Sequence, residues 1–74
     1  MNNLSRAFGN RLVTIRKTKR LTQEKLAEKT GISIDFLSML ERGYRSPSFT
    51  TIEHLANALA IEVKELFDFS KDTL

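Results

Sequence analysis

The apolar residues of this 74-residue chain recur with the period of an α-helix along most of its length. The first of them are Leu4, Phe8, Leu12 and Ile15. Their spacings of four, four and three residues place them on one face of a helix. Similar groups, separated by residues typical of caps and turns, predict helices over residues 3–19, 23–30, 34–42, 49–60 and 63–68. The pattern therefore predicts an all-α fold of five helices.

Capping residues mark the boundaries between these helices. Thr22, Ser33 and Ser48 each precede a predicted helix, and a hydroxyl at that position can accept a hydrogen bond from the first turn. Gly31 and Gly43 follow predicted helices and can adopt the positive φ that ends a helix in a tight turn. The connections are only a few residues long, which favours a compact helical domain.

Composition narrows the class of protein. A chain of this length has room for one domain, over residues 1–74. With no cysteine and a single histidine, His54, we expect no disulfide, metal or cofactor. The first ten residues are too polar for a signal peptide, and the longest apolar run, 58–61, is too short to span a membrane. No arrangement typical of an enzyme is present. We therefore expect a cytoplasmic, non-enzymatic protein.

The basic residues are concentrated towards the start of the chain. The net charge is +3, from twelve Lys and Arg against nine Asp and Glu. Residues 1–45 hold ten basic and four acidic residues, a net charge of +6, whereas residues 46–74 hold two basic and five acidic residues, a net charge of −3. Six basic residues and no acidic residue lie between Arg6 and Arg20. This pattern suits a polyanion, although charge alone favours a solvated helix face.

Residues 23–42 have the outline of a helix-turn-helix, which is two short helices joined by a turn that contains glycine. Ala27 is small where the two helices would cross, and Gly31 permits the turn. The predicted shared interior consists of Leu26, Ile32, Leu37 and Leu40. The opposite face of the third helix then carries Ile34, Asp35, Ser38, Met39 and Arg42. We expect this face to enter the major groove of DNA.

The side chains of this face indicate how DNA would be read. Ser38 can exchange hydrogen bonds with base edges, and Ile34 and Met39 can contact thymine methyl groups. Asp35 either accepts a hydrogen bond from cytosine N4 or only favours the first turn of its helix. Ile34 and Met39 are also compatible with protein binding.

The chain resembles the Cro and phage-repressor family of helix-turn-helix regulators, also called the xenobiotic-response-element family. The resemblance covers roughly residues 8–67 and rests on Ile15-Arg16, residues 21–27, residues 31–33, residues 37–43, Pro47-Ser48, Leu55-Ala56 and Leu66-Phe67. It implies a compact five-helix lambda-repressor-like domain that binds double-stranded DNA, usually as a homodimer on a short palindromic operator. Phage-type repressors and restriction-modification controller proteins share this size.

The resemblance also implies roles for particular residues. The position of Gln23 anchors the DNA backbone in similar repressors, and Gln23 lies at a helix start, which favours phosphate. Ser33 is expected mainly as a cap whose hydroxyl can also contact DNA. The family places Arg42, Tyr44 and Arg45 along the sugar-phosphate backbone. It also pairs Arg16 with Glu41 inside the protein, so we exclude both from the DNA-binding set.

The end of the chain suggests a contact between subunits. Its apolar residues exceed what the core of a small domain needs, and they are Ile61, Val63, Leu66, Phe67 and Phe69. We expect them to form the homodimer interface, and we expect no small-molecule effector. The alternative function is a protein-interaction module, similar to an antitoxin or an adaptor, that docks a partner through Ile34, Met39 and the aromatic carboxyl end.

Overall fold

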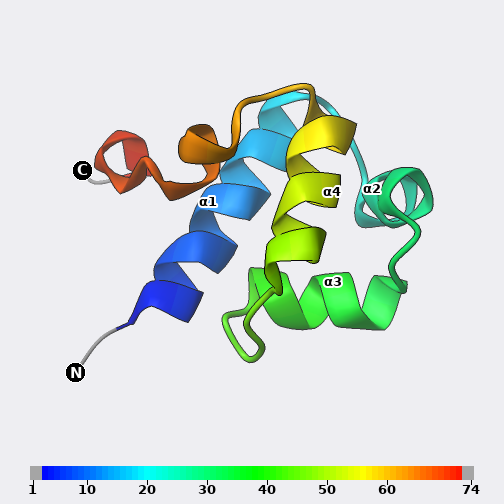
Figure 1. Cartoon of the computed structure of the whole chain (residues 1–74), viewed down its shortest axis with the longest axis horizontal. Helices are drawn as coiled ribbons and strands as arrows, with labels where there is room; N and C mark the ends of the chain where they lie inside the picture. The colour runs from blue at the N-terminus through cyan, green and yellow to red at the C-terminus, as the bar shows by residue number, and fades with distance from the viewer. Residues whose placement is uncertain (1–2, 73–74) are drawn as a thin grey trace.

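The computed structural model describes residues 3–72, which contain four α-helices and two 3₁₀-helices (Figure 1). The α-helices are α1 (Leu4–Thr18), α2 (Gln23–Thr30), α3 (Ile34–Glu41) and α4 (Phe49–Leu59). The 3₁₀-helices are η1 (Val63–Phe67) and η2 (Phe69–Asp72). These residues contain no strand, which confirms the all-α class. No helix among them has the length and apolar character needed to cross a membrane.

The prediction of a fifth α-helix over residues 63–68 is wrong. The segment forms the 3₁₀-helix η1, and a second 3₁₀-helix, η2, follows it. Five residues are too few to offset the cost of starting an α-helix. In addition, no side chain caps the start of η1 at Glu62. Leu66 is its one buried residue, and this side chain holds η1 on the core.

The predicted caps are present at α2, α3 and α4. The hydroxyls of Thr22, Ser33 and Ser48 accept hydrogen bonds of 3.0, 3.0 and 3.1 Å from the backbone N–H three residues further along. Gly31 and Gly43 have φ angles of 78° and 79°, as expected for residues that end helices in the left-handed conformation. The boundaries of these helices are therefore determined by neighbouring residues.

The core lies where the apolar faces of the four α-helices meet. Its members without exposed surface are Leu12, Leu26, Leu37, Leu40, Leu55 and Leu66. Figure 1 shows α3 lying across the end of the molecule at which α1 and α4 begin, while α2 packs against α3 and α4. The 3₁₀-helices η1 and η2 pack on α1. The predicted interior positions Leu26, Leu37 and Leu40 are confirmed.

Two close approaches between backbones fix α1 against the end of α3. A Cβ atom at Gly9 would lie 2.5 Å from the carbonyl oxygen of Leu40 and 2.6 Å from that of Glu41. A Cβ atom at Gly43 would lie 2.8 Å from Cα of Arg6. Because real Cβ contacts are longer than these, only glycine fits at either position without a shift of the neighbouring helix. These contacts position the loop that follows α3.

Candidate nucleic-acid interface

The turn between α2 and α3 occupies only residues 31–33. Gly31 leaves α2 in the left-handed conformation, Ile32 packs against the core, and Ser33 caps α3. Ala27 is 4% exposed, which fits the small residue predicted where the two helices meet. A short turn whose partly buried Ile32 packs on the core holds α3 at a fixed angle to α2. The face of α3 that points away from the core is therefore presented rigidly.

The exposed face of α3 carries the residues that the sequence predicts for base contacts. Ile34 is 44% exposed, and Asp35 is also exposed at the start of the helix. Ser38 and Met39 follow one turn later and are half-buried. Arg42 ends the helix as its C-cap and is exposed. These five side chains share one helix face because they are spaced by one, three, one and three residues.

The end of α3 is closed by two backbone hydrogen bonds. The N–H of Gly43 donates to the carbonyl of Leu40 at 3.1 Å, and the N–H of Tyr44 donates to the carbonyl of Met39 at 2.9 Å. This pair is the Schellman pattern, and the left-handed Gly43 makes it possible. It directs the chain sharply away from the helix axis. As a result Tyr44, 65% exposed, lies next to the last turn of α3.

Two arginines near this end rest on aromatic rings. The guanidinium carbon of Arg42 lies 5.0 Å from the centroid of the Tyr44 ring, and that of Arg45 lies 6.0 Å from the Phe36 ring. Each such contact stabilises a surface cation by about 0.5–1 kcal/mol. It orients the guanidinium while leaving edge N–H groups available to phosphate oxygens. The sequence reasoning missed Phe36, because its position on α3 belongs to neither the leucine face nor the face assigned to DNA.

Arg6 is a second residue that the sequence did not assign to this site. Its backbone packs against Gly43, so the first turn of α1 lies beside the loop that carries Arg42 and Tyr44. Arg6 is exposed. No local sequence signal reveals this proximity, because Arg6 and Gly43 belong to distant segments. The fold thus adds one more cation near the end of α3.

Two of the basic residues between Arg6 and Arg20 do not belong to a positive surface. The Arg11 side chain is 6% exposed, and its Nε donates a 2.8 Å hydrogen bond to the backbone oxygen of Glu65. Arg16 is likewise buried. Burial of Arg11 corrects the interpretation of this stretch as a surface for a polyanion. Arg11 instead ties α1 to η1.

Glu41 accepts hydrogen bonds from two elements and joins α1, α2 and α3. Arg16 donates to it from Nε at 2.7 Å and from Nη2 at 3.2 Å, which confirms the ion pair implied by the family resemblance. The Gln23 amide donates to Glu41 Oε1 at 2.7 Å. Arg16 Nη1 also donates to the carbonyl of Leu21 at 2.8 Å. The network orients the Gln23 amide and commits one of its two N–H groups to Glu41.

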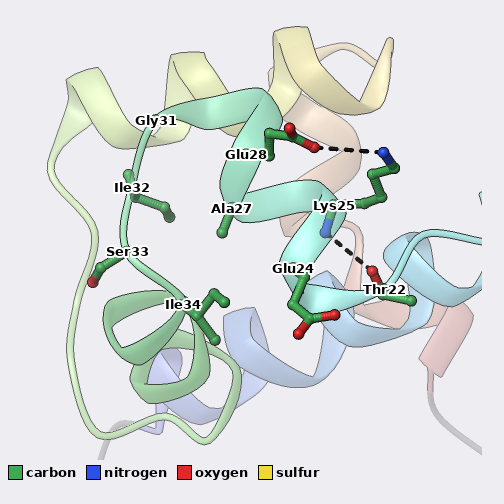
Figure 2. A pocket seen from close by; sticks show the side chains of 9 residues that line it. All are labelled: Thr22, Glu24, Lys25, Ala27, Glu28, Gly31, Ile32, Ser33 and Ile34. Carbon is green, nitrogen blue, oxygen red and sulfur yellow. Dashed lines mark hydrogen bonds and ion pairs between the residues drawn. The ribbon is translucent and has the colours of Figure 1, made fainter.

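A shallow pocket of about 770 Å³ lies between α2 and the start of α3 (Figure 2). Figure 2 shows Lys25 and Glu28 on one side of it, joined by an ion pair of 3.5 Å, and Ser33 on the other. Glu24 and Ile34 also line the pocket. Its two carboxylates, Glu24 and Glu28, make it unfavourable for phosphate, so phosphate contacts are favoured at the cationic end of α3.

The predicted subunit-contact residues divide between core and surface. Leu66 is fully buried in its own chain, which corrects its assignment to an interface with a partner. Ile61, Phe67 and Phe69 are half-buried, and Phe67 lies 5.4 Å from Phe8 and 6.2 Å from Phe69 between ring centroids. Val63 is 43% exposed. The core of a small domain therefore uses more of these residues than composition alone suggested.

A short turn between α2 and α3, and an exposed α3 that ends among cations, define a helix-turn-helix domain. The family model described as helix-turn-helix matches residues 12–66. The immunity repressor protein of Bacillus phage phi105 is 43% identical over 58 residues, which are 78% of this chain and 40% of that protein. The control protein C.BamHI of Bacillus amyloliquefaciens is 37% identical over 70 residues, or 93% of this chain and 86% of its own.

A solved structure shows the same likeness in three dimensions. The restriction-modification controller protein C.AhdI from Aeromonas hydrophila matches with a TM-score of 0.83 and 43% identity, over 85% of this chain and 96% of that one. The chain belongs to the helix-turn-helix family, and it is a DNA-binding transcriptional regulator of that class. The fold and the sequence resemblance therefore agree.

Proposed function

We propose that this regulator acts as a homodimer on a short palindromic operator, with α3 of each subunit in the major groove. The observation that carries the proposal is the continuity of the exposed α3 face with the loop after it. Base-reading side chains therefore lie next to the cations Arg42 and Arg45. Two half-sites in successive major grooves would place the two copies of α3 about 34–36 Å apart.

Base recognition is assigned to the exposed face of α3. The Ser38 hydroxyl donates to or accepts from base edges, and Met39 and Ile34 contact thymine methyl groups. Asp35 accepts from cytosine N4 where it faces a base. The Ser33 hydroxyl is already an acceptor for the N–H of Phe36, so Ser33 contributes to DNA binding mainly by fixing the start of α3.

Phosphate binding is assigned to the end of α3 and the loop after it. The guanidinium groups of Arg42 and Arg45 are held beside aromatic rings, and the hydroxyl of Tyr44, an exposed residue, adds a further donor. Arg6 adds a cation from α1. Gln23 adds its second amide N–H at the start of α2, where helix N–H groups favour an anion. Such contacts supply most of the affinity and fix the register of α3 on the duplex.

The names of the relatives support two biological roles. The phage protein is named an immunity repressor, and C.BamHI and C.AhdI are named control or controller proteins. We propose that the present chain is a phage-type repressor or a controller of a restriction-modification system. The high coverage of C.BamHI and C.AhdI supports the second role, because the chain spans 86% and 96% of their lengths but only 40% of the phage repressor.

Selection of binding sites from random double-stranded DNA, followed by titration at several salt concentrations, tests the proposal. Arg42→Ala should weaken binding to all sequences alike and reduce the log-log salt slope by roughly 0.9, the value for one phosphate contact. Ser38→Ala should instead change the selected sequence. Lys64→Ala is the matched control, because Lys64 is an exposed cation on η1 and should alter neither property. Binding that selects no sequence and does not depend on salt would refute the proposal.

A further inference from the structure

Phe49 is 88% exposed, which is the highest value for a large apolar residue in the described part of the chain. Phe49 is the first residue of α4 and directly follows the cap Ser48, so its backbone is held firmly while its ring extends into solvent. When a partner covers an aromatic side chain completely, about 150–250 Å² of its surface is removed from water. Aromatic side chains, phenylalanine included, are enriched at the centres of protein contacts.

A groove of about 220 Å³ lies beside this ring. We define the Phe49 surface as Leu4, Pro47, Phe49, Ile52 and Phe67, which line the groove. None of the side chains that line it is charged. Since an apolar cavity of roughly 150 Å³ is large enough to bind benzene, the groove has room for a phenyl ring.

We propose that the Phe49 surface is the contact between two copies of this chain, with Phe49 of each copy entering the groove of the other. A protruding ring and a groove that accepts it lie on the same face, and this self-complementarity is what a two-fold contact requires. The lack of charge also favours a second copy as the occupant. Two identical charged surfaces would repel each other, whereas two identical apolar surfaces do not.

The position of the surface relative to α3 fits the same arrangement. The Ser46 hydroxyl, in the loop after α3, and the Ser5 hydroxyl, near the start of α1, are joined by a hydrogen bond of 2.8 Å. Figure 1 shows that the starts of α1 and α4 and this loop all lie at the end of the molecule crossed by α3. The Phe49 surface is therefore next to the end of the helix that is proposed to read DNA.

The size of the molecule brings two such surfaces together on DNA. The described chain measures 31 × 21 × 19 Å, so copies on half-sites about 34–36 Å apart lie close enough to contact each other. The inference rests on the proposed homodimer and gives that dimer a location. It differs from the location predicted at the carboxyl end. Phe67 belongs both to the Phe49 surface and to the interface predicted at the carboxyl end, whereas Val63 belongs only to the predicted interface and does not line the groove.

Sedimentation equilibrium of the full chain tests the location with two matched variants. Phe49→Ser should raise the dimer Kd about 100-fold, because each of two identical anchors contributes roughly a tenfold change. Val63→Ser, a change at an apolar residue that is 43% exposed, should leave the Kd within about threefold. Both changes are at exposed positions, so circular dichroism should show unchanged helix content. Equal Kd values for Phe49→Ser and the unmodified chain, or a purely monomeric unmodified chain, would overturn the inference.

Disulfide cross-linking adds an independent readout, because the chain contains no cysteine. Oxidation of Thr50→Cys, a change at an exposed position next to Phe49 that keeps the ring, should give covalent dimers much faster than oxidation of Val63→Cys. Equal rates or the reverse order would overturn the inference.

DNA carrying one or two half-sites separates this inference from the proposed function. Phe49→Ser should bind one half-site as the unmodified chain does and lose only the extra affinity for two. Failure of the unmodified chain to select any DNA would refute the proposed function, while sedimentation would still decide the contact surface.

Discussion

Replacement of Gly9 by alanine should destabilise the protein, although local helix propensity predicts the opposite. In an exposed helix interior, Gly→Ala stabilises by about 1 kcal/mol, because alanine loses less backbone entropy on folding. At Gly9 the new methyl carbon would lie 2.5 Å from the carbonyl oxygen of Leu40 and 2.6 Å from that of Glu41. Ordinary contact begins at 3.4 Å, so α1 and α3 would have to separate by about 0.9 Å.

The expected size of the effect follows from these distances. Forcing extra carbon into a packed site costs roughly 1–3 kcal/mol, and two rigid backbone carbonyls oppose the methyl group here, which favours the upper end. Subtracting the propensity gain leaves a net loss of about 2 kcal/mol. A chain of this length has a total unfolding free energy of about 4–11 kcal/mol, so the loss is a substantial fraction.

Urea denaturation followed by circular dichroism measures the change. With a slope of about 1 kcal/mol/M for a small domain, Gly9→Ala should lower the midpoint by about 2 M. Asn10→Ala is the matched control, because Asn10 is the next residue of α1 and is exposed. That change should raise stability by about 0.5 kcal/mol. If Gly9→Ala is as stable as Asn10→Ala, α1 and α3 do not approach as closely as described.

Two further predictions concern charged residues. Glu41→Gln should lower the unfolding free energy by about 3 kcal/mol, because it leaves the buried Arg16 guanidinium without its counter-charge, and urea denaturation measures this loss. A double variant with Arg16→Met and Glu41→Leu should recover most of it, and a double variant less stable than Glu41→Gln would contradict the reasoning. Arg6→Ala should weaken binding to every DNA sequence several-fold and reduce the salt slope, as fluorescence titration can measure. If Arg6→Ala has the same salt slope as the control Lys64→Ala, Arg6 does not contact phosphate.

The candidate site illustrates how far sequence reasoning extends. The pattern around Leu37 and Leu40 identified the exposed face of α3, because a helix of known phase determines which side chains oppose a buried pair. The same reasoning missed two residues. One is Phe36, whose ring contacts the guanidinium of Arg45, and the other is Arg6, whose backbone lies beside Gly43. Both depend on where a loop or another helix passes, and the helical period contains no information about that.

The sequence by itself determined the positions of the four α-helices, their caps at Thr22, Ser33 and Ser48, and the left-handed turns at Gly31 and Gly43. These features depend on interactions between residues a few positions apart, so they can be recognised from local spacing and residue type. The helix-turn-helix outline is of this kind, since a few neighbouring residues define both of its helices and the turn.

Only the tertiary structure decided what lies between distant segments. It showed that α1 and α3 meet at Gly9, that Arg11 is buried against η1, and that Leu66 completes the core of its own chain. It also left Phe49 exposed beside an uncharged groove. An apolar or charged residue type does not specify its own neighbours. Burial and exposure depend on the packing of whole helices, and that packing is decided by contacts between residues far apart in the sequence.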